Sequence, residues 1–190
     1  KLDYTENAVT LDVLTKIALA HPQVSFSLYF DDKLRFKTSG RNDLKETIMN
    51  IYGLTHVKNL LPINVSTTDF KISGFLGNTN LVRANRYGII TNLNGRNVYM
   101  PKVQSAIIEG YHGFIAPSRF PFVILNFEIE PELVDVNVHP TKKEVRFSKE
   151  DKLREILIKE IPLALRHDEF IPQDTYVKAS EPSVLPYEKP

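Results

Sequence analysis

The chain contains no cysteine. This absence excludes disulfide bonds, thiol nucleophiles and thiolate-bound metal ions, and it suits a protein of the reducing cytoplasm. No apolar run approaches the roughly 18–20 residues that a membrane-spanning helix needs. The first residues, KLDYTENAVT, lack the charged-then-apolar form of a signal peptide. We therefore expect a cytoplasmic protein. Because the chain does not begin with methionine, we also expect it to be a fragment of a longer one.

Motifs that cradle phosphates are also missing. Neither GxxxxGK[ST] nor GxGxxG occurs, and the eight glycines stand at turn-like places. The five histidines do not show the spacing of metal ligands. The net charge of +1 indicates no particular partner. The sequence therefore predicts that this chain holds neither a cofactor nor a metal ion, and that it is not an enzyme by itself.

Periodicity predicts an α+β domain with a mixed β-sheet and helices packed on one face. Asn94-Gly95 between apolar runs predicts a hairpin, because both residues tolerate positive φ. Gly53 is expected to end one helix and Pro101 to begin another. The predicted helices are 5–20, 43–52, 101–111 and one after 148, and the predicted strands are 24–30, 34–38, 60–65, 69–76, 87–93, 97–100, 121–129 and 134–139.

The chain is expected to divide into three parts. Residues 1–22 form an entry helix, and residues 23–170 form the α+β domain. Residues 171–190 carry four prolines and no periodicity, so we expect a disordered linker towards an absent C-terminal domain.

The most informative stretch is VDVNVHPTKKEVRF, residues 134–147. Val134, Val136 and Val138 alternate with polar residues, which predicts a half-buried strand. Pro140 ends the strand, and Lys142 follows in a loop from which an ammonium group can reach a phosphate. His139 is expected to support that loop through a side-chain hydrogen bond. Spacing alone also allows a bland interpretation, since lysine pairs in turns are usually only solvated.

These fourteen residues resemble the VDVNVHP-x-K-x-EVRF signature of the MutL family of DNA mismatch repair proteins. In that family the lysine after His-Pro-x contacts the terminal phosphate of ATP held by the preceding subdomain, so the resemblance implies this role for Lys142. The helix ending in IALAHP, the hairpin after it and the turn Asn94-Gly95-Arg96 are similar to MutL proteins as well. The resemblance covers residues 5–170 and implies the transducer-like fold of MutL and gyrase B.

The resemblance also implies what the full-length protein does. The family's general-base glutamate, metal-binding asparagine, adenine pocket and glycine-rich lid precede this part of the protein, and none occurs here. We therefore expect the second subdomain of an ATPase that uses ATP and Mg²⁺ only at full length. The implied partners are DNA, a MutS-type mismatch-recognition protein, the ATP-binding subdomain of the same chain and a second copy in a homodimer.

Basic residues concentrate between Leu81 and Phe120, where Glu109 is the only acidic residue. Such a patch indicates contact with DNA phosphates without sequence preference, although a solvated surface would look the same in the sequence. Pro101 takes the place of a basic residue that the family uses for DNA, and Lys102 adjoins it. The candidate DNA-binding residues are Arg83, Arg86, Arg96, Lys102 and Arg119.

Two other functions remain open at this point. The chain could be the transducer domain of a type II topoisomerase, but that family presents its lysine in a Gln-Thr-Lys loop, which does not occur here. It could also be a plain protein-interaction domain, in which Lys142 would contribute surface charge only.

Overall fold

The computed structural model describes residues 2–136 and 145–170. A sheet of five strands lies at its centre, in the order β3-β4-β9-β6-β7. The neighbours β6 and β9 are parallel and the other pairs are antiparallel, so the prediction of a mixed sheet is confirmed. The strands are β3 (Leu60–Ser66), β4 (Phe70–Gly77), β6 (Ile89–Leu93), β7 (Arg96–Asn97) and β9 (Val123–Ile129).

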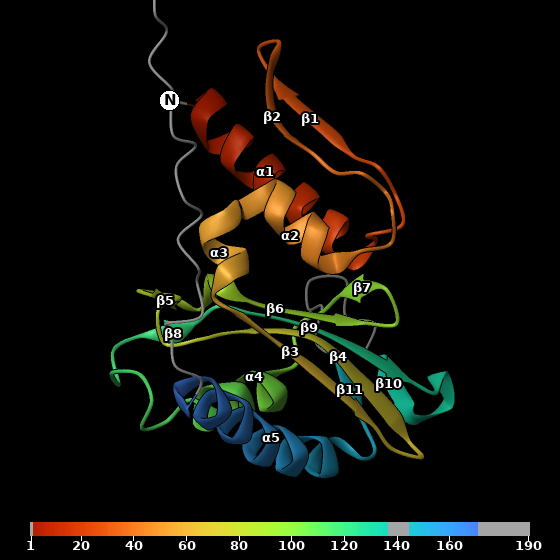
Figure 1. Ribbon diagram of the computed structural model, residues 1–190. Helices are drawn as coiled ribbons and strands as arrows, with labels where there is room; N and C mark the ends of the chain where they lie inside the picture. The colour runs from red at the N-terminus through yellow and green to blue at the C-terminus, as the bar shows by residue number, and fades with distance from the viewer. Residues whose placement is uncertain (1, 137–144, 171–190) are drawn as a thin grey trace, which may run out of the picture.

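Helices α4 (Pro101–Gly110) and α5 (Glu150–Phe170) cover the lower face of this sheet in Figure 1. The largest core cluster lies between them and the sheet. Gly110 is essential to this packing, because a Cβ added there would lie 2.9 Å from the Cβ of Ile161 on α5. Pro101 occupies the first turn of α4, as predicted.

The opposite face of the sheet carries a second layer, which the prediction of helices on one face did not include. This layer consists of α1 (Leu2–Ala20), β1 (Ser27–Phe30), β2 (Lys33–Lys37), α2 (Leu44–Tyr52) and α3 (Leu54–Lys58) (Figure 1). Leu19 and Ile48 pack with Ile90, Phe122 and Ile124 of the sheet region and form a second core cluster.

The predicted start and end of the helix over 43–52 are confirmed. The Asp43 carboxylate accepts a hydrogen bond from the Glu46 backbone at 3.0 Å and caps α2. Gly53, at φ 89°, ends α2 as predicted. The short helix α3 was not predicted.

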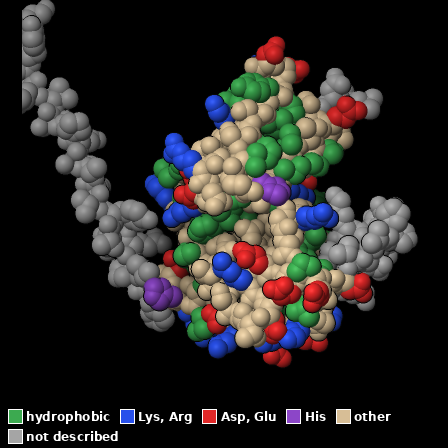
Figure 2. Space-filling model, turned by 90° about the vertical axis from the view of Figure 1, so that its right-hand side faces the viewer, with side chains coloured by type: hydrophobic (Ala, Val, Ile, Leu, Met, Phe, Trp, Pro, Cys, Tyr) green, Lys and Arg blue, Asp and Glu red, His purple; other side chains and the backbone are tan. Residues whose placement is uncertain are grey.

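The apolar residues of α1 do not all lie on its buried face. Ala18 and Leu19 are fully buried, whereas Val9, Val13 and Ile17 are 59%, 47% and 39% exposed. Figure 2 shows several apolar side chains exposed close together over the upper part of the molecule, among charged ones, and charged side chains of both signs along its lower edge.

The remaining elements are short. They are β5 (Val82–Arg83), η1 (Arg86–Gly88), β8 (Phe120–Pro121), η2 (Pro131–Leu133), β10 (Val134–Val136) and β11 (Val145–Phe147). Strand β5 pairs with β8, and β10 pairs with β11, each as a separate two-stranded sheet. No helix in the described part of the chain is long and apolar enough to cross a membrane. The predicted linker 171–190 lies outside the described residues.

Candidate functional site

Strands β10 and β11 flank the segment that contains the predicted phosphate-contacting lysine. They are antiparallel, with Val134 opposite Phe147 and Val136 opposite Val145. The Ser148 backbone donates to the Leu133 carbonyl at 3.1 Å and extends the pairing by one step. Asp135 is exposed. Both Lys142 and His139 lie outside the described residues, so the structure places the two ends of their segment and not the side chains themselves.

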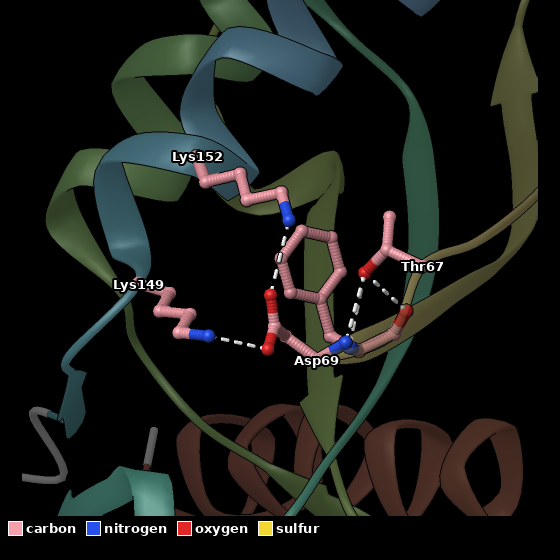
Figure 3. A network of polar contacts seen from close by, with 5 residues as sticks. Thr67, Asp69, Lys149 and Lys152 are labelled. Carbon is pink, nitrogen blue, oxygen red and sulfur yellow. Dashed lines mark hydrogen bonds and ion pairs between the residues drawn. The ribbon is translucent and has the colours of Figure 1, made fainter.

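The β10–β11 pair is fixed to the main sheet through its last residue. Phe147 is buried, and its ring meets the ring of Phe70 edge to face, with the centroids 6.1 Å apart. Phe70 begins β4. The residue before it, Asp69, pairs with Lys149, which directly precedes α5, and with Lys152 in the first turn of that helix (Figure 3). The ring contact of Phe70 and the ion pairs of Asp69 are thus made by neighbouring residues of the β3–β4 region, about 80 residues earlier in the chain than their partners.

The Asp69 carboxyl titrates abnormally in these surroundings. Hydrogen bonds from the ammonium groups of Lys149 and then Lys152 hold its pKa below the ordinary value for an aspartate. The lowered pKa extends the charged form of the carboxylate to a lower pH than an ordinary aspartate would reach.

Arg83 and Arg86 lie together at the edge formed by β5, η1 and β8. The Arg83 guanidinium lies over the ring of Phe122 and that of Arg86 lies over Phe120, at 5.5 Å and 5.4 Å from the ring centroids. Arg119 directly precedes β8 and is exposed. These three predicted DNA-binding residues are therefore brought to one end of the sheet.

Arg83 also forms a hydrogen bond with a side chain of helix α3. Its Nη2 donates to Nε2 of His56, a residue of α3 that stacks on Tyr52 with ring centroids 5.2 Å apart. Burial, and then the charge of Arg83, lower the pKa of His56. Burial raises the pKa of Tyr52 to about 12. Arg83 therefore fastens α3 to the sheet edge as well as presenting a charge.

Arg96 lies at the other end of the sheet, directly after the Asn94-Gly95 turn. The turn residues have φ values of 48° and 80°, as the hairpin signal predicted. The Asn94 side chain donates to the Ile129 carbonyl at 2.8 Å and accepts from the Ile129 N–H at 3.0 Å, which ties the turn to the end of β9. This pairing fixes the position from which Arg96 points to solvent.

A hollow of about 460 Å³ separates α1 from the turn that carries Arg96. Its lining includes Lys16, His21, Arg96 and Asn97. A neighbouring hollow of about 370 Å³ shares Lys16 and Asn97 and extends to Arg86 and to two exposed tyrosines, Tyr87 and Tyr99. The two hollows thus connect Arg96 with Arg86 along one side of the molecule. No sequence pattern pointed to Lys16, which comes from α1.

Lys102 is placed differently from the other four candidates. Its ammonium group lies 3.7 Å from Glu150 and 3.5 Å from Asp151, at the start of α5. Glu150 is 6% exposed. Lys102 therefore faces carboxylates in the α4–α5 layer, whereas Arg96 lines the hollow beside α1. Within residues 2–136 and 145–170, no group of three His, Asp or Glu side chains could hold a metal ion.

Comparison with known proteins identifies relatives over most of the chain. Residues 48–166 match the family model described as "DNA mismatch repair protein, C-terminal domain". DNA mismatch repair protein MutL of Streptococcus uberis is 39% identical over 187 residues, which are 97% of this chain and 28% of the relative. MutL of Halalkalibacterium halodurans is 39% identical over 175 residues, 92% of this chain and 28% of the relative. The chain thus spans little more than a quarter of these proteins.

Solved structures share the fold. The N-terminal domain of a DNA repair protein superposes with a TM-score of 0.69 at 21% identity, covering 85% of this chain and 54% of the other. The Aquifex aeolicus MutL ATPase domain complexed with ADP gives a TM-score of 0.51 at 16% identity, covering 80% of this chain and 48% of the other. The predicted α+β, transducer-like fold is confirmed.

Proposed function

The chain belongs to the MutL family of DNA mismatch repair proteins, and we propose that it senses ATP bound by another part of the full-length protein. In this proposal Lys142 contacts the terminal phosphate, and His139 supports its loop. The transducer of a type II topoisomerase, the first alternative, is set aside because the family is MutL.

One observation carries the proposal: the segment with Lys142 connects two paired strands that the structure fixes at both ends. The β10–β11 register and the Phe70–Phe147 contact hold these ends against the main sheet. The described residues on both sides of that segment are therefore held in place, and its lysine would supply the charged donor that recognition of a terminal phosphate needs. The solved relative that contains ADP extends well beyond the region this chain covers, which leaves room for nucleotide binding elsewhere in the protein.

The full-length protein is proposed to be an ATPase that uses ATP and Mg²⁺. The sequence of this chain carries no phosphate-cradling motif, so the chain itself is proposed to lack ATPase activity. A homodimer and a MutS-type partner follow from the family and are proposed for the full-length protein only.

A second proposed role is DNA contact without sequence preference, through Arg83, Arg86, Arg96 and Arg119. The linked hollows beside α1 support it, because they bring Arg86 and Arg96 to one side of the molecule. Lys16 lies in the same lining but is paired with Asp12 at 2.7 Å. Lys102 was proposed from the sequence as a fifth contact, and its ion pairs with Glu150 and Asp151 argue against a large share.

Replacement of Lys142 in the full-length protein tests the nucleotide role. A charge-assisted hydrogen bond to phosphate is worth about 1.5–3 kcal/mol, so Lys142→Ala should lower the rate of ATP hydrolysis roughly 10- to 150-fold. Lys143→Ala is the matched control and should hydrolyse ATP at a nearly normal rate. Wild-type kinetics in purified Lys142→Ala would instead favour the remaining alternative, a plain protein-interaction domain.

A further inference from the structure

The β6–β7 turn carries the only Asn-Gly pair in the sequence, Asn94-Gly95. Asparagine before glycine is chemically labile, because glycine has no side chain to hinder attack by its own backbone nitrogen. That nitrogen can bond to Cγ of the asparagine, and the side-chain amide then leaves as ammonia with the proton of the glycine N–H. Water opens the resulting succinimide ring to aspartate or isoaspartate, and either product carries a negative charge that asparagine lacks.

The folded turn holds the Asn94 side chain away from Gly95. Its Nδ2 donates to the Ile129 carbonyl at 2.8 Å, and its Oδ1 accepts from the Ile129 N–H at 3.0 Å. Ile129 ends β9, and β6 lies between β9 and β7 in the sheet (Figure 1). The side chain is therefore turned towards β9, whereas Gly95 leads the chain towards β7. Because Asn94 is exposed, these two bonds, and not exclusion of water, hold back ring closure.

The products of deamidation cannot restore this arrangement. An aspartate at position 94 has no hydrogen to donate to the Ile129 carbonyl, so one of the two bonds is lost. Isoaspartate leads the main chain through the former side chain and lengthens it by one methylene group. A two-residue turn with φ values of 48° and 80° does not accommodate that extra group. Deamidation is therefore expected to leave the turn open once it has occurred.

Arg96 depends on this turn for its position. It is the first residue of β7 and pairs with Leu93 across the turn. Strand β7 has two residues and lies at the edge of the sheet, so the turn is the main determinant of its register. Deamidation would displace Arg96 and add a negative charge two positions before it, and both changes weaken contact with a phosphate.

We propose that Asn94 is a modification site at which spontaneous deamidation switches off the DNA contact of Arg96. The pairing with Ile129 suppresses the reaction in the folded turn, and each local opening of the turn permits it. Water is the co-reactant, and the reaction needs no enzyme. The inference rests on the proposed contact between Arg96 and DNA.

Peptide mass spectrometry of the full-length protein, kept in mildly alkaline buffer, tests the protection. Folded Asn94 should deamidate roughly 5- to 150-fold more slowly than Asn94 in urea at the same pH, the factor that two net hydrogen bonds supply. Asn97, which precedes Val98, is the internal control and should react more slowly than Asn94 in the unfolded protein. Equal rates at Asn94 in folded and unfolded protein would overturn the inference, as would an unfolded rate at Asn94 no higher than that at Asn97.

DNA binding by variants of the full-length protein tests the consequence. Asn94→Asp carries the charge of the product and should lower the slope of log affinity against log salt by about 1, the value of one phosphate contact. Asn64→Asp is the matched control and should keep the wild-type slope, because it adds the same charge to an exposed residue of β3, at the opposite edge of the sheet from β7.

A variant that cannot deamidate provides a second comparison. Asn94→Gly suits the positive φ of the turn. After an incubation that deamidates Asn94, the wild type should show the lowered slope, and Asn94→Gly should keep the slope it had before. Equal losses of slope in the two incubated proteins would overturn the inference, since the loss would then arise elsewhere in the molecule.

The variants also separate this inference from the proposed function. A wild-type slope in Asn94→Asp, with a lowered slope in Arg96→Gln, would refute the inference and leave the proposed DNA contact standing. A wild-type slope in Arg96→Gln would refute both. Equal losses in Asn94→Asp and Asn64→Asp would overturn the inference as well, because the added charge would then act without regard to its place.

Discussion

The ammonium group of Lys102 lies 3.5 Å from the Asp151 carboxylate, and these two residues are 49 positions apart in the sequence. With Glu150 at 3.7 Å, two carboxylates share this one cation. DNA phosphates would have to compete with both of them for Lys102. Arg96, the nearest other candidate along the chain, lines the hollow beside α1, where the one carboxylate of the lining, Asp12, is already paired with Lys16 at 2.7 Å.

Salt dependence of DNA binding should therefore distinguish Arg96 from Lys102. The logarithm of the affinity falls linearly with the logarithm of the salt concentration, and each lost phosphate contact lowers the slope by about 1. We expect Arg96→Gln to lower the slope by about that amount and Lys102→Gln to leave it nearly unchanged. Fluorescence anisotropy with a duplex of arbitrary sequence measures both. Equal effects of the two variants would contradict the assignment.

Acid stability should depend on Asp69. The pKa of Asp69 in the folded chain lies below the ordinary value. Its contribution to the free energy of unfolding is therefore fully present above pH about 4 and is lost as the pH falls through the folded pKa. Asp69→Asn should remove this part of the pH dependence. Urea unfolding of the chain at pH 3 to 6 is the measurement. A variant whose stability falls with acid as steeply as that of the wild type would show that other carboxylates dominate.

The imidazole of His56 should titrate below its ordinary pKa. Because burial and then the charge of Arg83, which donates to Nε2, disfavour the protonated ring, the neutral ring is the form that the fold stabilises. Its contribution to stability is fully present above pH about 6.5 and is lost as the pH falls through the folded pKa. NMR titration of the ring protons checks the direction of the shift. A His56 pKa at or above the ordinary histidine value of about 6.5 would refute this account.

The middle of the sheet should not tolerate a side chain at position 74. Gly74 has φ 134° and belongs to β4, which pairs with β3 on one side and β9 on the other. A Cβ on this residue would come 2.1 Å from the Ile124 carbonyl oxygen. Gly74→Ala is expected to destabilise the fold by more than about 2 kcal/mol. Ser73→Ala, one residue earlier on the same strand, serves as the comparison. Similar unfolding midpoints for the two variants would contradict this packing.

Local signals were enough to predict most of the fold. Asn94-Gly95, Gly53 and Pro101 each act through their own backbone preferences, so their turn, helix end and helix start could be predicted from neighbouring residues alone. Helix α3 was missed because Leu54–Lys58 is too short to show a helical period. The second helical layer was missed because an amphipathic pattern predicts that a helix buries one face but does not predict which face of the sheet that helix covers.

The site needed contacts that the sequence does not display. Asp69 meets Lys149 from 80 positions away, and Lys102 meets Asp151 from 49. Charge counting between Leu81 and Phe120 therefore grouped Lys102 with Arg96, although their surroundings differ. Lys16 was overlooked for the same reason, since only the fold brings α1 beside the 94–96 turn.

Chemical labelling of lysines in the full-length protein tests the central claim most directly. An amine reacts with acylating reagents in its neutral form, and a phosphate in contact with the ammonium group disfavours that form. A non-hydrolysable ATP analogue with Mg²⁺ should therefore protect Lys142, while labelling of the adjacent Lys143 changes little. Peptide mass spectrometry reads out both residues in one sample. Protection of Lys142 well beyond that of Lys143 is the result predicted here, and equal labelling of Lys142 with and without the nucleotide would contradict its contact with ATP.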